Sequence, residues 1–87
     1  MTNEHALPET RLTLITRVDC GLCEEAKHDL QRLGAQFDTV DVDEDAALLR
    51  LYNEAVPVLM LDGAELARAP FTEKTLRLAI DLSRAEA

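Results

Sequence analysis

The two cysteines of this chain, Cys20 and Cys23, are separated by only two residues. They stand where a β-branched, apolar run gives way to a run with helical periodicity. A C-x-x-C pair beside a β-α-β pattern is typical of a dithiol redox site. Two intervening residues are enough to close a disulfide ring, and they keep both sulfurs together when the pair is reduced. The pair therefore predicts reversible thiol–disulfide chemistry.

Metal binding is the main alternative for two closely spaced cysteines. A structural zinc site needs four ligands, commonly two pairs at characteristic spacing, and the chain has no second pair. His28 follows Cys20 by about two helical turns, so we expect it on a solvated helix face, and His5 precedes the first predicted strand. No metal site is predicted, and iron–sulfur ligation between two subunits has no specific support in the sequence.

The position of each cysteine predicts its role. Cys20 falls in the turn at the start of a predicted helix, where unpaired backbone N–H groups and the helix dipole stabilise a thiolate. We therefore expect Cys20 to be the nucleophile. Cys23 lies one turn further in and should be the shielded, resolving thiol. Gly21 removes side-chain bulk where a substrate must approach, and Leu22 lies in the first turn on the apolar face of the predicted helix.

The spacing of apolar residues predicts elements in the order β-α-β-α-β-β-α. The predicted strands are the run Arg11–Val18, which contains the apolar and β-branched segment Leu12–Thr16, and the segments Phe37–Val42, Val58–Leu61 and Glu65–Arg68, with a hairpin turn at Asp62-Gly63. Three helices are predicted from their core-facing residues. The first has Leu22, Ala26, Leu30 and Leu33 on its core face and ends at Gly34. The second begins after a cap at Asp43, ends at about Asn53 and has the core face Ala47, Leu48, Leu51 and Tyr52, and the third begins after a cap at Thr72 and has Leu76, Ala79, Ile80 and Ser83 on one face. A right-handed crossover makes the first two strands parallel, so we expect an α/β fold with a four-stranded mixed sheet and three helices.

Composition limits the functional classes. The chain has 87 residues and a formal net charge of −8, from 17 acidic and 9 basic side chains. This balance disfavours nucleic acid and anionic membrane surfaces as partners. No apolar stretch approaches the ~20 residues that cross a bilayer, and the N-terminus lacks signal-peptide features. We expect residues 1–10 to form a flexible tail, residues 11–87 to form one domain, and the protein to be a cytoplasmic monomer.

These features together resemble the thioredoxin superfamily in its minimal form. The resemblance rests on three features: the element order, the Cys20-Gly21-Leu22-Cys23 motif between the first strand and first helix, and Val56-Pro57 before the third strand. The motif with its following Glu-Glu-Ala, the preceding Asp19 and the segment Val56–Leu59 are most similar to small bacterial glutaredoxin-like proteins. The resemblance covers roughly residues 11 to 83 and implies a minimal thioredoxin-like (glutaredoxin-like) fold.

The resemblance also implies a substrate site. It places a cis peptide bond at Val56-Pro57 facing the dithiol, with the backbone of Val56 pairing with an extended substrate. Arg17 matches the basic residue that lies three before the first cysteine in glutaredoxins, and with Val56-Pro57 it makes glutathione a candidate co-substrate. The third part of the glutathione site, a Gly-Gly-Asp-type turn, is replaced by Ala67-Arg68-Ala69-Pro70-Phe71-Thr72. The predicted substrate-binding residues are Val56, Pro57, Arg17, Gly21 and Leu22.

Three functions compete on this basis. The first is a thiol–disulfide oxidoreductase, with no bound cofactor, that reduces protein disulfides or mixed disulfides, its partner being a disulfide-containing protein or a small-molecule thiol substrate. The second is a peptide-binding module with little redox turnover. The third is a metal or cluster carrier. The first is favoured because both cysteines fall at one strand-to-helix junction.

Overall fold

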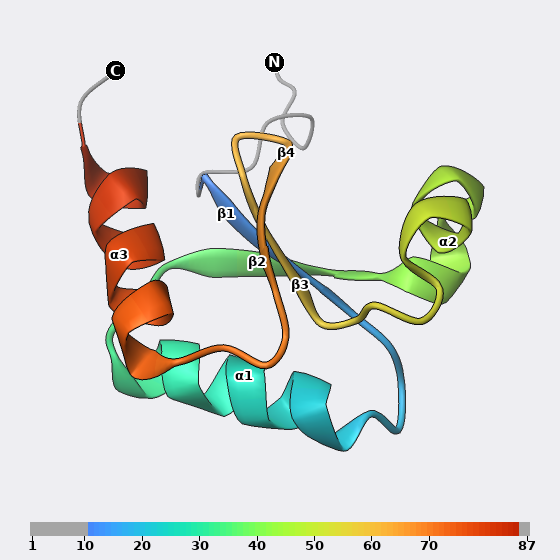
Figure 1. Cartoon of the computed structure of the whole chain (residues 1–87), viewed down its shortest axis with the longest axis horizontal. Helices are drawn as coiled ribbons and strands as arrows, with labels where there is room; N and C mark the ends of the chain where they lie inside the picture. The colour runs from blue at the N-terminus through green and yellow to red at the C-terminus, as the bar shows by residue number, and fades with distance from the viewer. Residues whose placement is uncertain (1–10, 86–87) are drawn as a thin grey trace, which may run out of the picture.

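Four strands form one mixed sheet in the order β2-β1-β3-β4 (Figure 1). The computed structural model describes residues 11–85. Its elements are β1 (Leu12–Thr16), α1 (Gly21–Arg32), β2 (Phe37–Asp41), the 3-10 helix η2 (Val42–Glu44), α2 (Ala46–Tyr52), β3 (Val58–Leu61), β4 (Ala64–Arg68) and α3 (Glu73–Arg84). Strand β1 pairs parallel with β2 and antiparallel with β3, and β3 pairs antiparallel with β4. The predicted α/β fold, its element order and its mixed sheet are therefore confirmed, whereas the predicted tail, residues 1–10, lies outside the described residues.

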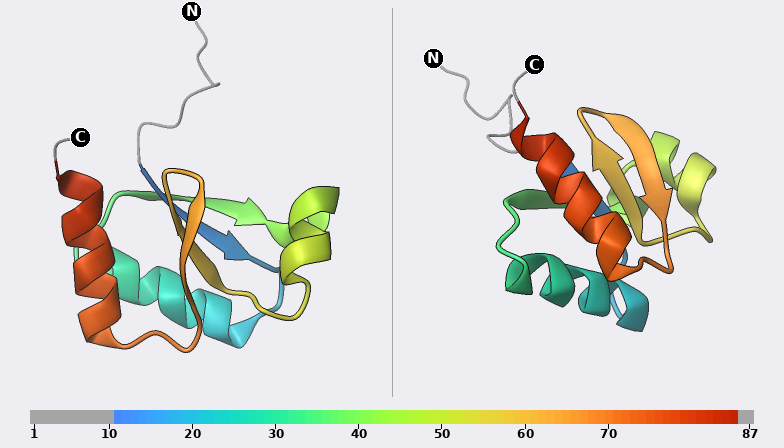
Figure 2. Two further views of the ribbon diagram at one scale, coloured as in Figure 1. Left: turned by 45° about the horizontal axis from the view of Figure 1, so that its top comes forward. Right: turned by 60° about the vertical axis from the view of Figure 1, so that its left-hand side comes forward.

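The helices cover both faces of the sheet. Helices α1 and α3 lie on one face and α2 on the other, as the right-hand view of Figure 2 shows. The alternation of side chains along β1 supplies both cores: Leu12 and Leu14 join the cluster under α1 and α3, and Ile15 joins the cluster under α2. None of the helices in residues 11–85 combines the length and the apolar character that a membrane crossing requires.

Local signals in the sequence set most element ends. Gly34, with φ +80°, ends α1: its N–H donates to the carbonyl of Gln31, and the N–H of Ala35 donates to the carbonyl of Leu30. This pair of bonds is the Schellman arrangement that a glycine at this position favours. Thr72 caps α3 by accepting the N–H of Thr75 at 3.1 Å, as predicted.

Three expectations about the first two helices are wrong. The cap of α2 is Asp45, which accepts the N–H of Leu48 at 3.0 Å, because the chain after β2 first makes the extra turn η2 that contains Asp43. Leu22 is 54% exposed, since α1 begins at Gly21 and turns Cys23, Ala26 and Leu30 toward the sheet. The core residues of α2 are Leu48, Leu49 and Tyr52, whereas the predicted core residues Ala47 and Leu51 are exposed.

Candidate active site

The two cysteines lie where β1 ends and α1 begins, at the lower right of Figure 1. They form a disulfide, and their Cα atoms are 5.2 Å apart, within the range that disulfides span. Cys20 is the N-cap of α1 and has extended backbone angles, φ −113° and ψ 110°. The strand-to-helix junction therefore places the pair at the positive end of the helix dipole.

The sulfur of Cys20 acts as the helix cap. It accepts a hydrogen bond from the backbone N–H of Cys23 at 3.1 Å, and the carbonyl of Cys20 accepts the N–H of Glu24 at 3.1 Å. A sulfur that caps a helix gains stabilisation when it carries a negative charge, because the N–H dipoles point toward it. The geometry thus favours the thiolate form of Cys20 when the disulfide is reduced.

The two thiols differ in access. Cys23 is 0% exposed and belongs to the buried face of α1, whereas Cys20 is half-buried at the turn. Gly21 is exposed, and a Cβ built on it would meet nothing within 4 Å. Leu22, the second residue between the two cysteines, is also exposed. A substrate can therefore reach Cys20 over Gly21, and Cys23 can be reached only from within the fold.

The turn before Cys20 has an unusual backbone. Asp19 has φ +61°, in the left-handed region that residues with a Cβ seldom adopt. Its side chain is exposed and forms no hydrogen bond or ion pair with residues 11–85. Val18 beside it is 69% exposed. Asp is among the non-glycine residues found most often at positive φ, so an Asp shortly after a strand was the signal for this turn in the sequence.

Arg17 connects the same turn to the rest of the fold through hydrogen bonds. Its Nε and one terminal nitrogen donate to the two carboxylate oxygens of Asp43 at 2.9 and 3.0 Å. The other terminal nitrogen donates to the carbonyl of Asn53 at 2.8 Å, and a further bond of 2.7 Å reaches the side-chain oxygen of Asn53. The hydrogen bonds with Arg17 hold the pKa of Asp43 below its ordinary value and raise the pKa of Arg17. The sequence did not reveal these two partners of Arg17.

The Val56-Pro57 segment lies beside the dithiol turn. The peptide bond between these residues is cis. Figures 1 and 2 show the chain between α2 and β3 running next to the chain between β1 and α1, and the contact of Arg17 with Asn53 joins these two connections. The carbonyl of Pro57 accepts the N–H of Ala69 at 3.1 Å, so the loop between β4 and α3 reaches the same region.

A shallow groove adjoins the cysteine motif at Leu22, on the side of that third loop. It is lined by Leu22, Glu25, Ala26 and Asp29 of α1 and by Ala69, Pro70 and Phe71. The Ala69-Pro70 peptide bond is also cis, and no local signal in the sequence indicated this. The predicted residues Arg17, Gly21, Leu22, Val56 and Pro57 thus all belong to segments that border the cysteines. Their contact with a substrate stays a prediction.

Metal-ligating side chains do not gather in the part of the chain that the structure describes. Among residues 11–85 there is no group of three or more His, Cys, Asp or Glu side chains placed to hold a metal ion. His28 is exposed on α1, which is where the helical spacing placed it.

Comparison with known proteins connects this geometry to a family. Residues 11–81 match the family model described as glutaredoxin-like domain (DUF836). The crystal structure of target protein XcR50 from X. campestris is 41% identical over 82% of this chain and 96% of that chain, with a TM-score of 0.69. Protein Ne2328 from Nitrosomonas europaea is 27% identical over 92% and 99% of the two chains, with a TM-score of 0.68.

A plant protein shares the fold at lower identity. The holo form of glutaredoxin C1 from Populus tremula x tremuloides is 19% identical, with 90% of this chain and 82% of that chain covered and a TM-score of 0.68. At this identity the likeness concerns the fold alone. No curated protein sequence matches the chain.

Proposed function

This chain belongs to the glutaredoxin-like domain family, and from that membership we propose that it is a thiol–disulfide oxidoreductase working through Cys20 and Cys23. The observation that carries the proposal is the contrast between the two sulfurs at the start of α1. The half-buried Cys20 receives an N–H from the helix, and Cys23 is fully buried directly behind it. A dithiol reductase needs this division between an attacking thiol and a resolving thiol.

The reaction follows from that division. The thiolate of Cys20 attacks one sulfur of the substrate disulfide; a new S–S bond forms, and the other substrate sulfur leaves as a thiolate that takes up a proton. Cys23 then loses its proton, attacks the sulfur of Cys20, closes the internal disulfide and releases the second substrate thiol. Two electrons pass from the dithiol to the substrate. An external thiol reductant, small or protein-borne, returns the disulfide to the dithiol.

The substrate would lie across the segments that border Cys20. The open position at Gly21 and the exposed Leu22 leave room for it, and an extended segment can pair with the backbone of Val56 before Pro57. Protein disulfides or mixed disulfides are the proposed substrates, with glutathione as a candidate co-substrate and no bound cofactor. The protein would act as a cytoplasmic monomer without nucleic-acid or membrane partners.

Two serine variants test the proposal. With insulin as substrate and dithiothreitol as reductant, Cys20→Ser should remove the activity, because no nucleophile remains at the accessible position. Reduced Cys23→Ser, freed of dithiothreitol before insulin is added, should still attack but should stop at the mixed disulfide, which mass spectrometry detects as a covalent adduct of protein and substrate. Each variant is the control for the other, since both lose one thiol and neither can form the internal disulfide.

The outcomes separate the roles clearly. An adduct on Cys23→Ser and none on Cys20→Ser supports the assigned roles. The reverse pattern would exchange the roles of the two cysteines. Wild-type turnover in Cys20→Ser, or a Cys20–Cys23 disulfide that dithiothreitol cannot reduce in the folded protein, would refute the oxidoreductase function.

A further inference from the structure

The groove beside the cysteines limits the size of what it can hold. Its volume is about 60 Å³. Sites that enclose small ligands usually measure ~300–1,000 Å³. The groove therefore has room for the end of one side chain and does not enclose a molecule the size of a tripeptide.

The charges along the groove are negative. Glu25 and Asp29 line it. The carboxylate of Glu25 is exposed and makes no hydrogen bond or ion pair within residues 11–85, and Asp29 lies 3.7 Å from Arg32. Asp19, directly before Cys20, is likewise exposed and unpaired within the described chain. A substrate that approaches Cys20 from this side meets the unpaired carboxylates of Glu25 and Asp19, whereas Asp29 is paired with Arg32.

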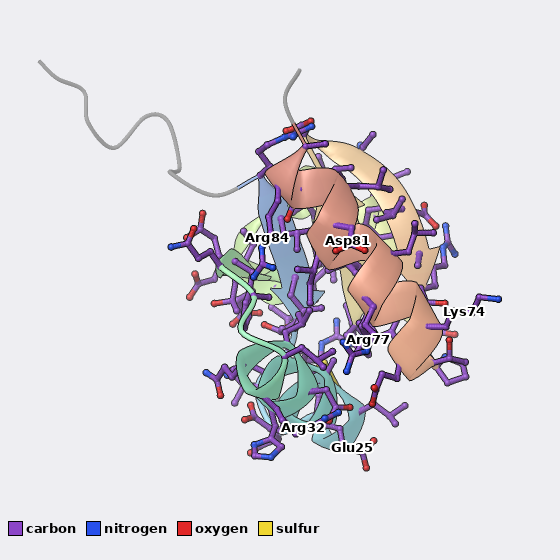
Figure 3. All side chains as sticks on the ribbon, turned by 90° about the vertical axis from the view of Figure 1, so that its left-hand side faces the viewer. Glu25, Arg32, Lys74, Arg77, Asp81 and Arg84 are labelled. Carbon is purple, nitrogen blue, oxygen red and sulfur yellow. A yellow bond between two sulfur atoms is a disulfide. The ribbon has the colours of Figure 1, made fainter. Side chains whose placement is uncertain are left out.

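The basic side chains near the motif do not offset this charge. Arg17, the nearest before the cysteines, is bound to Asp43 and Asn53, and Lys27, the nearest after them, lies 3.3 Å from Glu24. Lys74, at the start of α3, extends away from Glu25 in Figure 3. An anionic substrate would therefore find no cation that is both free and close to the sulfurs among these residues.

Apolar side chains complete the surface. Val18 is 69% exposed and Leu22 is 54% exposed, and they stand on either side of Cys20 in the sequence. A polypeptide that docks at the disulfide can cover both, whereas a small thiol covers little of them. The surface thus combines apolar contact with a negative rim, and its complement is a cationic, partly apolar polypeptide.

Resting on the oxidoreductase function proposed above, we infer that the substrate is a polypeptide disulfide with Lys or Arg side chains next to its cysteines, and that Glu25 determines this specificity. The substrate's basic side chain would enter the groove and pair with Glu25 while Cys20 attacks the neighbouring sulfur. Glutathione carries two carboxylates and one ammonium group, so its charge is of the disfavoured sign.

Single-turnover exchange with matched peptides tests the inference. Reduced protein, freed of reductant, is mixed with a peptide that contains one internal disulfide flanked by two Lys, two Gln or two Glu residues, and the rate of peptide reduction is followed by chromatography. Each exposed ion pair is worth ~0.2–1 kcal/mol, or up to about fivefold. We expect the Lys peptide to react roughly tenfold faster than the Glu peptide at low salt, and the ratio to approach one near 1 M salt, where the Debye length is ~3 Å.

Two charge-reversal variants locate the effect. Glu25→Lys should reduce the ratio several-fold or invert it, and Glu25→Gln should give an intermediate ratio. Asp81→Lys alters the net charge by the same amount, but from α3, where Figure 3 shows Asp81 well apart from Glu25. It should leave the ratio within about twofold of the wild-type value. Circular dichroism checks that each variant is folded.

The results distinguish this inference from the oxidoreductase function. Equal rates for the three peptides, or a ratio that Asp81→Lys changes as much as Glu25→Lys, would overturn the charge preference while leaving the exchange chemistry intact. Glutathione disulfide reacting faster than the Lys peptide would overturn the polypeptide as the preferred substrate. No exchange with any of these disulfides would refute the underlying function as well.

Discussion

Substitutions at Asp19 separate two effects in the active-site turn: the effect of its backbone conformation on stability, and the effect of its carboxylate on the reactivity of Cys20. The φ of +61° lies in the region that costs a residue with a Cβ about 1 kcal/mol, although Asp and Asn tolerate it better than other residues. Asp19→Ala keeps the Cβ without the short polar group, so we expect the free energy of unfolding to fall by about 1 kcal/mol. Asp19→Gly removes the strain but adds ~0.5–1 kcal/mol of unfolded-chain entropy, and the two nearly cancel. Asp19→Asn should match the wild type.

The effect of the Asp19 charge on the reactivity of Cys20 should rank the three variants differently from their stabilities. All three variants remove the carboxylate next to Cys20, and a surface charge of this kind contributes ~0.2–1 kcal/mol. Alkylation of the reduced protein by iodoacetamide near neutral pH should therefore accelerate by up to about fivefold, and by similar factors in the Ala, Gly and Asn variants. Melting temperature reports the backbone effect, with Asp19→Ala about 4–8 °C below Asp19→Gly. Equal stability of those two variants would contradict the backbone reasoning, and reactivities that follow the order of stability would contradict the charge reasoning.

Three further predictions concern the scaffold. Leu30→Ala, at a fully buried position, should lower the free energy of unfolding by about 3–4 kcal/mol in urea denaturation, whereas Leu78→Ala, at a position 57% exposed, should change it by less than about 0.5 kcal/mol. Thr72→Ala should cost about 1 kcal/mol in the same experiment through loss of the α3 cap, and Thr72→Ser should restore most of it. Because Arg17 lowers the pKa of Asp43 in the folded state, their pair stabilises the fold fully above the ordinary Asp pKa of 3.8, and this contribution is lost as pH falls through the lowered value. Unfolding curves between pH ~6 and ~2 should therefore show a smaller acid-induced loss of stability for Asp43→Asn than for the wild type.

The parts of the fold that follow from local signals were predictable. The apolar run of β1, the Asp62-Gly63 turn and the cap at Thr72 each depend on a few adjacent residues, and the structure contains all three. Asp62 and Gly63 both have positive φ, the geometry of a tight hairpin turn. The rotation of α2 was not predictable, because all of its seven residues except Arg50 are apolar. Only packing against Ile15 and Val58 selects the buried side.

In the candidate site, too, some features follow from local sequence and others depend on the tertiary fold. The Cys20-x-x-Cys23 spacing and the helix start predicted the sulfur pair, and the exposed fractions of the two cysteines agree with the predicted order of access. The partners of Arg17 lie 26 and 36 residues away in the sequence, and the groove joins residues 22–29 to residues 69–71. Such contacts arise from the tertiary fold, and no local pattern encodes them.

Arg17 shows why a basic residue at a family position does not by itself establish a ligand contact. A guanidinium has five N–H donors in a fixed fork, and in this chain Asp43 and Asn53 receive four hydrogen bonds from it. The same contacts that hold the turn bearing Cys20 against the α2–β3 connection also neutralise the charge that an anionic substrate would need. Because Asp43 and Asn53 accept the hydrogen bonds of Arg17, the active-site turn is fixed in place. The carboxylates around the sulfurs are then not balanced by the charge of Arg17. The residue that suggests glutathione by its position thus favours, by its contacts, a cationic polypeptide.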